Sequence, residues 1–173
     1  MLPSSPTFGE QDYSVRCKYR RQSMENFFIR PAIVSEHTEL EALQRRASLT
    51  NAGDRNALLT HPDAIELPLE QIVAGAVFVC ELNGTIAGFA ALVPRSDEGV
   101  ELDALFTDPT MRRRGIARSL VEHCSKVARS QGSAFLHVVG NPHAEHFYLA
   151  CGFQLTGTTE TRFGPGLLMR RFV

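Results

Sequence analysis

The stretch DPTMRRRGIARSL, residues 108–120, places three consecutive arginines directly before a glycine and an apolar helical pattern. The alternation of polar and apolar residues at 100–104 within VELDALFT, residues 100–107, predicts a strand before it. Apolar residues then recur at helical spacing, so a helix is expected to begin near Gly115. A helix N-terminus presents unpaired N–H groups and partial positive charge, and glycine lets an anion approach the backbone closely. The stretch therefore predicts a phosphate-binding loop.

Three anionic partners would suit the arginines: a nucleic acid, a membrane surface or a small phosphate-bearing molecule. The whole chain carries 18 Lys+Arg against 19 Asp+Glu, a formal net charge of −1. Nucleic-acid-binding domains usually carry a clear basic excess, and no apolar run here approaches the roughly 20 residues that span a bilayer. We therefore expect a small ligand, with neither nucleic acid nor membrane as a partner.

The length and the cysteines indicate one intracellular domain. A chain of 173 residues suffices for a single core, which we place at residues 26–173, after a polar and flexible tail at 1–25. Its four cysteines are widely and irregularly spaced, which favours neither a zinc site nor a disulfide framework. Cys80 and Cys124 fall in apolar patterns and are expected in the core. A cytoplasmic location follows from this reduced state.

Strand and helix patterns alternate along the domain and predict an α/β fold with a mixed sheet covered by helices. Thr38 and Glu41 form a capping-box pattern for the first helix, and Asn83-Gly84 is a strong hairpin signal. A longer loop, residues 161–166, is expected to join the last two strands. Strands are expected at 27–30, 77–82, 85–93, 100–107, 134–139, 153–158 and 167–173, and helices at 39–49, 54–59, 68–74, 115–132 and 143–150.

The strand before the arginine loop alternates in polarity. Simple alternation puts Glu101, Asp103 and Leu105 on one face of the sheet. Leu102, Ala104 and Phe106 would then lie on the opposite face. Two carboxylates are thus expected side by side, a few residues before the predicted phosphate loop.

Two motifs stand in a fixed order along the chain. The spacing Arg112-x-x-Gly115-x-Ala117 lacks the Walker A ending and the G-x-G-x-x-G pattern, and NPHA at 141–144 and FYLACGF at 147–153 follow downstream. Together they resemble the GNAT superfamily of acyl-CoA-dependent N-acetyltransferases, whose signatures are a Q/R-x-x-G-x-G/A loop and N-x-x-A followed by F-Y-x-x-x-G-F. The resemblance covers residues 27–173. It implies a mixed, mostly antiparallel sheet of six to seven strands that is splayed between the fourth and fifth.

The same resemblance implies acetyl-CoA as a co-substrate and assigns residues to it. The amides of residues 112–117 would hold the pyrophosphate, and the backbone of residues 106–107 would pair with the pantetheine arm. Arginine side chains next to the loop would add charge near the phosphates. The full set of implied cofactor-binding residues is Phe106, Thr107, Arg112, Arg113, Arg114, Gly115, Ile116, Ala117, Arg118, Asn141, Ala144 and Phe147.

Catalysis by such an enzyme needs a proton acceptor and a proton donor. An attacking amine arrives mostly protonated, so a carboxylate, Glu101 or else Asp103, is expected to take a proton directly or through water. The resemblance places Tyr148 as the general acid for the leaving thiolate, and the backbone N–H near Phe106 as the oxyanion donor. His143 and His146 lie at metal-ligand spacing, but they do not make a closed ligand set, so no metal is expected.

We expect acetyl to pass from acetyl-CoA to a primary amine, on a small molecule or a peptide, that attacks the thioester directly in a ternary complex. In the resembled fold the acceptor site is built from residues 39–75 and the late hairpin loop. Glu66 and Glu70, together with the carboxylates before the loop, hint at a cationic amine. The alternatives are a catalytically inactive acyl-CoA sensor for the function, and a homodimer in place of a monomer for the assembly.

Overall fold

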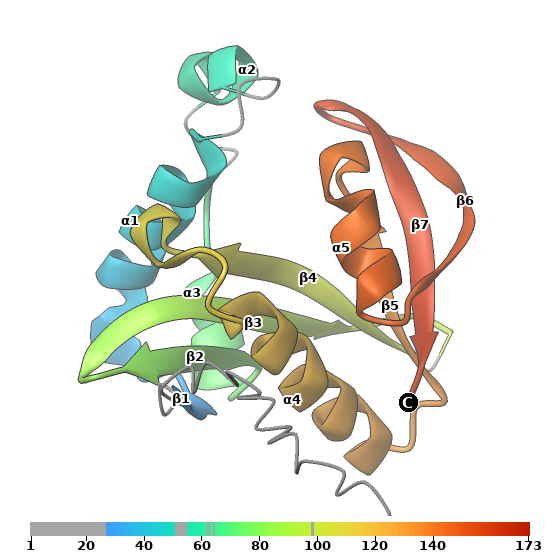
Figure 1. Ribbon diagram of the computed structural model, residues 1–173, viewed down its shortest axis with the longest axis horizontal. Coiled ribbons are helices and arrows are strands. Elements are labelled where there is room, and N and C mark those ends of the chain that lie inside the picture. The colour runs from blue at the N-terminus through green and yellow to red at the C-terminus, as the bar shows by residue number, and fades with distance from the viewer. Residues whose placement is uncertain (1–26, 51–54, 62, 64, 98) are drawn as a thin grey trace, which may run out of the picture.

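The computed structural model describes residues 27–50, 55–61, 63, 65–97 and 99–173, and the expected tail lies outside them (Figure 1). Within these ranges one seven-stranded sheet runs in the order β1-β2-β3-β4-β5-β7-β6. Its strands are β1 (Phe27–Pro31), β2 (Val77–Leu82), β3 (Thr85–Pro94), β4 (Val100–Thr107), β5 (Phe135–Gly140), β6 (Gln154–Thr161) and β7 (Gly164–Phe172). The helices are α1 (His37–Ser48), α2 (Arg55–Thr60), α3 (Leu69–Val73), α4 (Ile116–Ser130) and α5 (Glu145–Ala150), with 3-10 turns η1 (Val34–Glu36), η3 (Pro109–Met111) and η4 (Pro142–Ala144).

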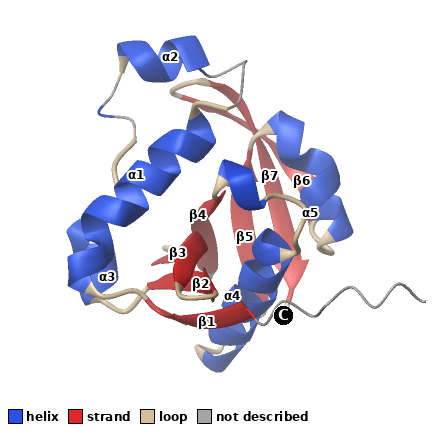
Figure 2. Cartoon of the chain, turned by 60° about the vertical axis from the view of Figure 1, so that its left-hand side comes forward, coloured by secondary structure: helices blue, strands red, loops and turns tan. Residues whose placement is uncertain are grey.

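The sheet is split between β4 and β5. These two strands run parallel and pair only at Val100↔Leu136 and Glu101↔His137, whereas every other neighbouring pair is antiparallel and pairs over most of its length. Figure 2 shows β4 and β5 diverging beyond that short contact. The predicted mixed, mostly antiparallel and splayed sheet is confirmed.

One of the two predicted hairpins is as expected, and the other has a shorter loop than expected. Asn83 and Gly84 both have positive φ, 52° and 77°, as a two-residue hairpin turn requires, so that prediction is confirmed. The last hairpin is tighter than predicted, because the β6–β7 ladder continues to Thr161↔Gly164. The β5–β7 ladder ends at Leu167, so β5 does not pair with β7 at Pro165. The proline, which has no N–H to donate, is therefore tolerated there.

The first helix begins two residues earlier than predicted, so Thr38 is not its N-cap. The chain first makes the turn η1, in which the backbone N–H of Ile33 donates to Glu36 Oε2 at 2.9 Å. Arg30 on β1 also donates to the Glu36 carboxylate, at 2.6 Å. Glu36 thereby binds β1 to the helix start, and α1 follows directly from His37.

Strand β4 contains a bulge, which the alternation argument missed. Ala91 on β3 pairs with Ala104 and the next residue, Leu92, pairs with Leu102, so Asp103 is an extra residue. Beyond the bulge the facing is reversed. Leu102 packs in the core under α4, whereas Ala104 belongs to the core under α1.

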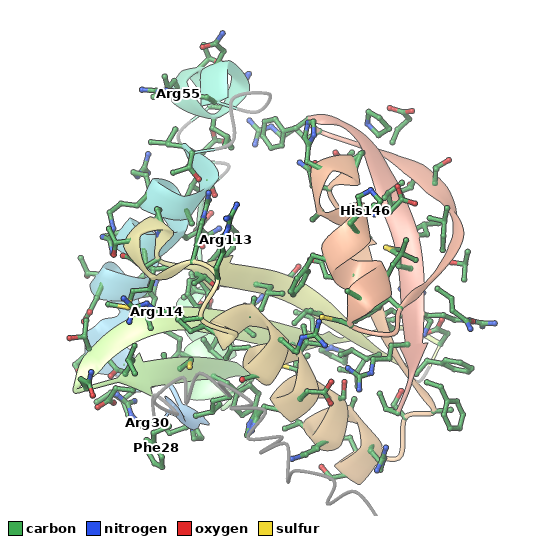
Figure 3. All side chains as sticks on the ribbon, viewed as in Figure 1. Phe28, Arg30, Arg55, Arg113, Arg114 and His146 are labelled. Atoms are coloured by element: carbon green, nitrogen blue, oxygen red, sulfur yellow. The ribbon has the colours of Figure 1, made fainter. Side chains whose placement is uncertain are left out.

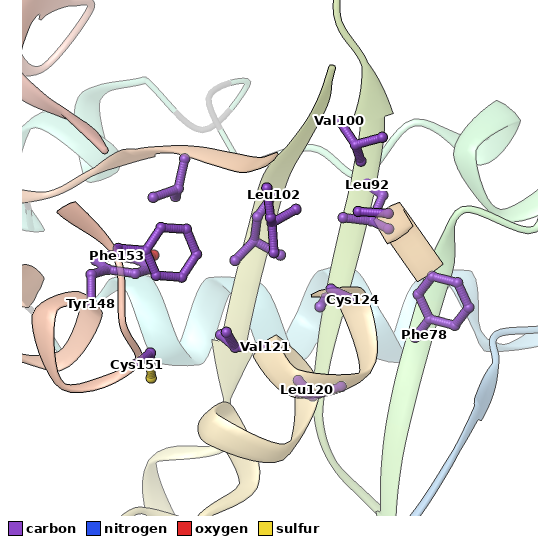
Figure 4. Packing of buried hydrophobic residues seen from close by; sticks show 14 of the residues in the cluster. Phe78, Leu92, Val100, Leu102, Leu120, Val121, Cys124, Tyr148, Cys151 and Phe153 are labelled. Carbon is purple, nitrogen blue, oxygen red and sulfur yellow. The ribbon is translucent and has the colours of Figure 1, made fainter. Parts of the chain in front are cut away.

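Each face of the sheet has its own apolar core. Helices α4 and α5 cover one face, where Leu120, Cys124 and Phe153 are buried with residues of β2, β3, β4, β5 and β7 (Figure 4). Helices α1 and α3 cover the other face around Phe89 (Figure 2). Cys80 and Cys124 are fully buried, as predicted, and burial raises the pKa of the Cys124 thiol to about 12.

The close approach of β3 to β4 depends on Gly88. A Cβ at this position would lie 2.6 Å from the carbonyl oxygen of Phe106 and 3.0 Å from Ile116. We expect Gly88→Ala to lower the free energy of unfolding by about 1–3 kcal/mol, because β4 and α4 both have to move away from β3.

The measurement is urea unfolding, with Gly157→Ala on β6 as a matched control. A Cβ at Gly157 meets its nearest neighbour at an ordinary 3.7 Å. Equal unfolding midpoints for the two variants would show that the β3–β4 contact is not tight.

Candidate active site

A cavity of about 510 Å³ lies where β4 and β5 separate. One side is formed by the end of β4 and by α1, and the other by the end of β5, η4 and the β6–β7 hairpin. It is lined by Gln44, Ala47, Ser48, Leu58, Ile65, Leu105, Phe106, Thr107, Arg112, Val139, Gly140, Asn141, Ala144, Thr161, Phe163, Pro165 and Gly166. The residues predicted to bind the pantetheine arm, Phe106 and Thr107, are therefore part of its wall.

The end of β4 offers polar groups to this cavity. Phe106 is half-buried, with its ring 5.5 Å from that of Phe89. The hydroxyl oxygen of Thr107 is buried and has no hydrogen-bond partner among the described residues. A buried hydroxyl without a partner destabilises the empty site, and a polar ligand in the cavity would remove that penalty.

The loop after β4 is fixed by Asp108. Its Oδ1 accepts from the N–H and the hydroxyl of Thr110, at 3.0 and 2.7 Å, and its Oδ2 accepts from Arg46 on α1 at 2.9 Å. The hydrogen bonds from Thr110, and then that from Arg46, hold the pKa of Asp108 below its usual range. The carboxylate thus stays ionised and ties the loop to α1.

The start of α4 has the form of an anion cradle. Gly115 is the N-cap with a φ of 84°, and Arg113 also has a positive φ of 64°. The first amides of the helix, from Ile116 onward, have no partner within the helix. All three arginines of the loop are exposed, and Figure 3 shows Arg113 and Arg114 on the chain just before α4.

Arg112 differs from its two neighbours in where its side chain lies. It lines the cavity, and its guanidinium donates a hydrogen bond to Thr50 Oγ1 beyond the end of α1. Arg118, in the first turn of α4, is exposed, and neither it nor Ala117 lines the cavity. The predicted phosphate loop is thus adjacent to the cavity and joined to it through Arg112.

The second motif forms η4 and α5 on the opposite wall. Asn141 accepts a hydrogen bond from the His143 N–H at 2.9 Å and caps η4. Asn141 and Ala144 line the cavity, whereas Phe147 is half-buried behind them, 5.2 Å from the Tyr148 ring. The structure thus brings Asn141 and Ala144 of the second motif to the same cavity as Arg112 of the first.

Tyr148 is buried immediately behind the cavity wall. A Cβ at Gly140, which does line the cavity, would lie 3.0 Å from the Tyr148 ring. The ring also meets Phe153, with centroids 5.4 Å apart. Burial, with a smaller contribution from Cys151, raises the pKa of Tyr148 to about 12. The phenol therefore keeps its proton at neutral pH.

The two candidate bases lie outside the cavity wall. Glu101 accepts a hydrogen bond from Arg95 at 2.8 Å, at the point where β4 and β5 still pair. Asp103, in the bulge, accepts from Gln71 of α3 at 3.1 Å and is exposed. A proton moving from the cavity to either carboxylate would have to travel through water.

The opposite end of the cavity is formed by the segments expected to build an acceptor site. Leu58 and Ile65 lie there with Phe163 of the β6–β7 turn. Outside the cavity wall, Arg162 of the β6–β7 turn donates a hydrogen bond to Asp63 at 2.9 Å, which links the two segments that form this end. The four carboxylates that hinted at a cationic amine, Glu66, Glu70, Glu101 and Asp103, do not line the cavity.

Sequence reasoning missed Gln44. This glutamine of α1 lines the cavity, is 9% exposed, and has a buried Oε1 with no partner among the described residues. Its signal was present: Gln44 stands four residues after Leu40 on the apolar stripe, where a polar residue needs an explanation.

Comparison with known proteins settles the family. The family model described as the acetyltransferase (GNAT) family matches residues 40–153, which is more than half of the chain. The chain belongs to the GNAT family. Curated relatives include uncharacterized N-acetyltransferases of Methanocaldococcus jannaschii, 33% identical over 86 residues, and of Mycobacterium tuberculosis, 32% identical over 92 residues. These alignments take in 44% and 51% of this chain, and 38% and 59% of the two relatives.

Solved structures show the same fold. The PaiA N-acetyltransferase of Thermoplasma acidophilum, crystallised with coenzyme A, superposes with a TM-score of 0.71 at 17% identity. The superposition covers 86% of this chain and 99% of that one. A GCN5-related N-acetyltransferase of Rhodopseudomonas palustris gives 0.68 at 18% identity, covering 84% and 95%. Within the described part of this chain, no helix is long and apolar enough to cross a membrane.

The buried phenol makes a pH prediction. Since folding favours its protonated form, the stability that Tyr148 contributes is present below about pH 10 and is lost as the pH rises through about 12. We expect one tyrosine ring-carbon resonance, absent in Tyr148→Phe, to titrate later than the others in an NMR pH series. Ionisation of that resonance near pH 10 would mean that the ring is reached by solvent.

Proposed function

We propose that this protein is an N-acetyltransferase that moves acetyl from acetyl-CoA to a primary amine by direct attack in a ternary complex. The observation that carries the proposal is the cavity itself. It opens at the split between β4 and β5 and is joined to the free N-terminus of α4 through Arg112. A thioester arm and an acceptor can meet in it, with a phosphate cradle beside it.

The cofactor is bound chiefly by backbone groups in this proposal. The amides at the start of α4 hold the pyrophosphate, and the unpaired edge of β4 at residues 106–107 hydrogen-bonds the pantetheine arm as an added strand would. Asn141 and Ala144 bound the arm on the other wall. The coenzyme A in the solved PaiA relative supports this cofactor.

The transfer proceeds in two bond changes. The amine lone pair attacks the acetyl carbonyl, and the resulting oxyanion accepts a hydrogen bond from backbone N–H near Phe106. The C–S bond then breaks, Tyr148 gives its proton to the CoA thiolate, and solvent returns that proton to the phenol. The surplus proton of the amine leaves through water to Glu101, with Asp103 as the alternative acceptor.

The class of acceptor amine and the cellular location of the protein are also part of the proposal. A relative from Salmonella typhimurium, 40% identical over 62 residues, is a peptidyl-lysine N-acetyltransferase, so a peptide amine stands beside a small-molecule amine. That match takes in 36% of this chain and 41% of the relative. Three buried free cysteines, Cys80, Cys124 and Cys151, suit the cytoplasm. The deciding assay is acetyl-CoA-dependent thiol release over a panel of amines; binding of CoA without any turnover would favour the sensor alternative.

Removal of the Tyr148 hydroxyl tests the acid role. We expect Tyr148→Phe to lower kcat by about ten- to a thousand-fold, because the leaving thiolate loses its proton donor. The dissociation constant for acetyl-CoA, measured by calorimetry, should stay nearly the same. Unchanged turnover would remove Tyr148 from the mechanism.

The phosphate cradle is tested by contrasting two loop residues. Gly115 has a left-handed conformation that costs an L-residue roughly 1–2 kcal/mol. An alanine there favours a different loop conformation in the free protein, and CoA binding has to restore the left-handed one. Gly115→Ala should therefore weaken CoA binding about fivefold or more. Arg113→Ala removes only an exposed, screened charge and should weaken it less than about threefold. Titration calorimetry at physiological salt compares them. A larger loss in Arg113→Ala would mean that side-chain charge, and not the helix start, binds the phosphates.

A further inference from the structure

The cavity wall contains a buried polar group that the proposed chemistry does not use. Gln44 lines the wall from α1, and its Oε1 is buried with no partner among the described residues. A buried carbonyl oxygen without a hydrogen bond is unfavourable and needs a reason. The terminal amide of glutamine turns readily about its last torsion, so a small rotation presents this oxygen to a bound molecule.

The charge of the wall limits what that molecule is. Among the described residues that line the cavity there is no Asp or Glu, and Arg112 is the sole residue with a full charge. The acceptor end is apolar, with Leu58 and Ile65 buried and Phe163 beside them. A polycation placed here would lose water and gain no counter-charge from the described residues of the wall.

The same wall disfavours an ammonium ion on the acceptor. Removal from water lowers the pKa of an amine, so the amine binds as the free base. For a lysine-like amine with a pKa near 10.4, the free base at pH 7 is roughly one part in a few thousand. For an amine with a pKa near 7.8, such as an α-amino group, it is about one part in seven.

We propose that the acceptor is a weakly basic primary amine on an uncharged, partly apolar body, and that Gln44 Oε1 accepts a hydrogen bond from its N–H. This inference rests on the proposed acetyltransferase function and names its substrate class. A cavity of about 510 Å³ must hold both the thioester arm and the acceptor, so the acceptor portion inside it is small. Gln44 is the specificity-determining residue of that site.

Steady-state kinetics with acetyl-CoA and three probe amines test the substrate class at pH 7. The probes are phenylalanine amide, spermidine and Nα-acetyl-lysine amide. The highest kcat/KM is expected for phenylalanine amide, by at least tenfold. A preference for spermidine or for the lysine ε-amine would overturn the inference.

Two variants test Gln44 itself. Gln44→Leu keeps the size and removes the amide, so KM for phenylalanine amide should rise at least tenfold while CoA affinity stays the same. Gln44→Glu adds the missing carboxylate and should raise the kcat/KM ratio of spermidine to phenylalanine amide by about tenfold. Gln154→Leu, the same change at an exposed β6 position, is the matched control and should change neither. An unaltered KM in Gln44→Leu would overturn the role of Gln44.

A binding measurement separates this inference from the proposed function. If no probe is acetylated, the proposed function fails, and calorimetry of each probe with the protein–CoA complex still decides the site. Phenylalanine amide that binds the wild type and Gln154→Leu, but not Gln44→Leu, would support the assignment. Binding by none of the probes, or equal binding by Gln44→Leu, would overturn it.

Discussion

The loss of hydrogen bonding between β4 and β5 is the constraint on which the rest of the molecule depends. Two residue pairs join these strands, and beyond them the β4 edge carries backbone groups that face a cavity and not another strand. Unpaired strand edges are normally avoided or covered. Here the core under α4 contains residues of β2–β4 and also of β5 and β7, so it joins the two halves of the sheet across the split. The split thus leaves backbone donors and acceptors for a ligand while the halves stay packed together.

Local sequence patterns predicted the elements well where backbone chemistry is decisive. Asn83-Gly84 fixed its hairpin because both residues accept positive φ, and Gly115 marked the helix start for the same reason. The patterns failed where a partner distant in sequence decides. Arg30 and Ile33 engage Glu36 and move the start of α1 away from Thr38. The extra residue at Asp103 depends on the register of β3, which no local alternation reveals.

The sequence predicted that Phe106, Thr107, Arg112, Asn141 and Ala144 share one site, and all five line the cavity, whereas it named no single residue of α1 or α2 there. Loop glycines and helix caps leave a sequence signature because the backbone itself binds the phosphates. The rest of the cavity wall comes from side chains on α1, α2 and the β6–β7 turn, and the positions of these segments in the sequence follow no fixed spacing. Gln44 illustrates the difference, since its place on an apolar stripe marks it as unusual without saying what it faces. Glu66 and Glu70 lie in the segment that was expected to build the acceptor site, but neither of them lines the cavity.

The ion pair between Arg46 and Asp108 couples α1 mechanically to the loop before α4. Arg46 lies two residues after Gln44 on α1, and Asp108 holds the loop that leads to the start of α4. A displacement of that loop by an arriving cofactor would therefore be transmitted to the helix that carries Gln44, and linkage requires an equal effect in the reverse direction. The Arg46 side chain is 52% exposed, which limits such a pair to about 1 kcal/mol. Cooperativity between the two substrates through this contact is thus limited to roughly a fivefold change in affinity.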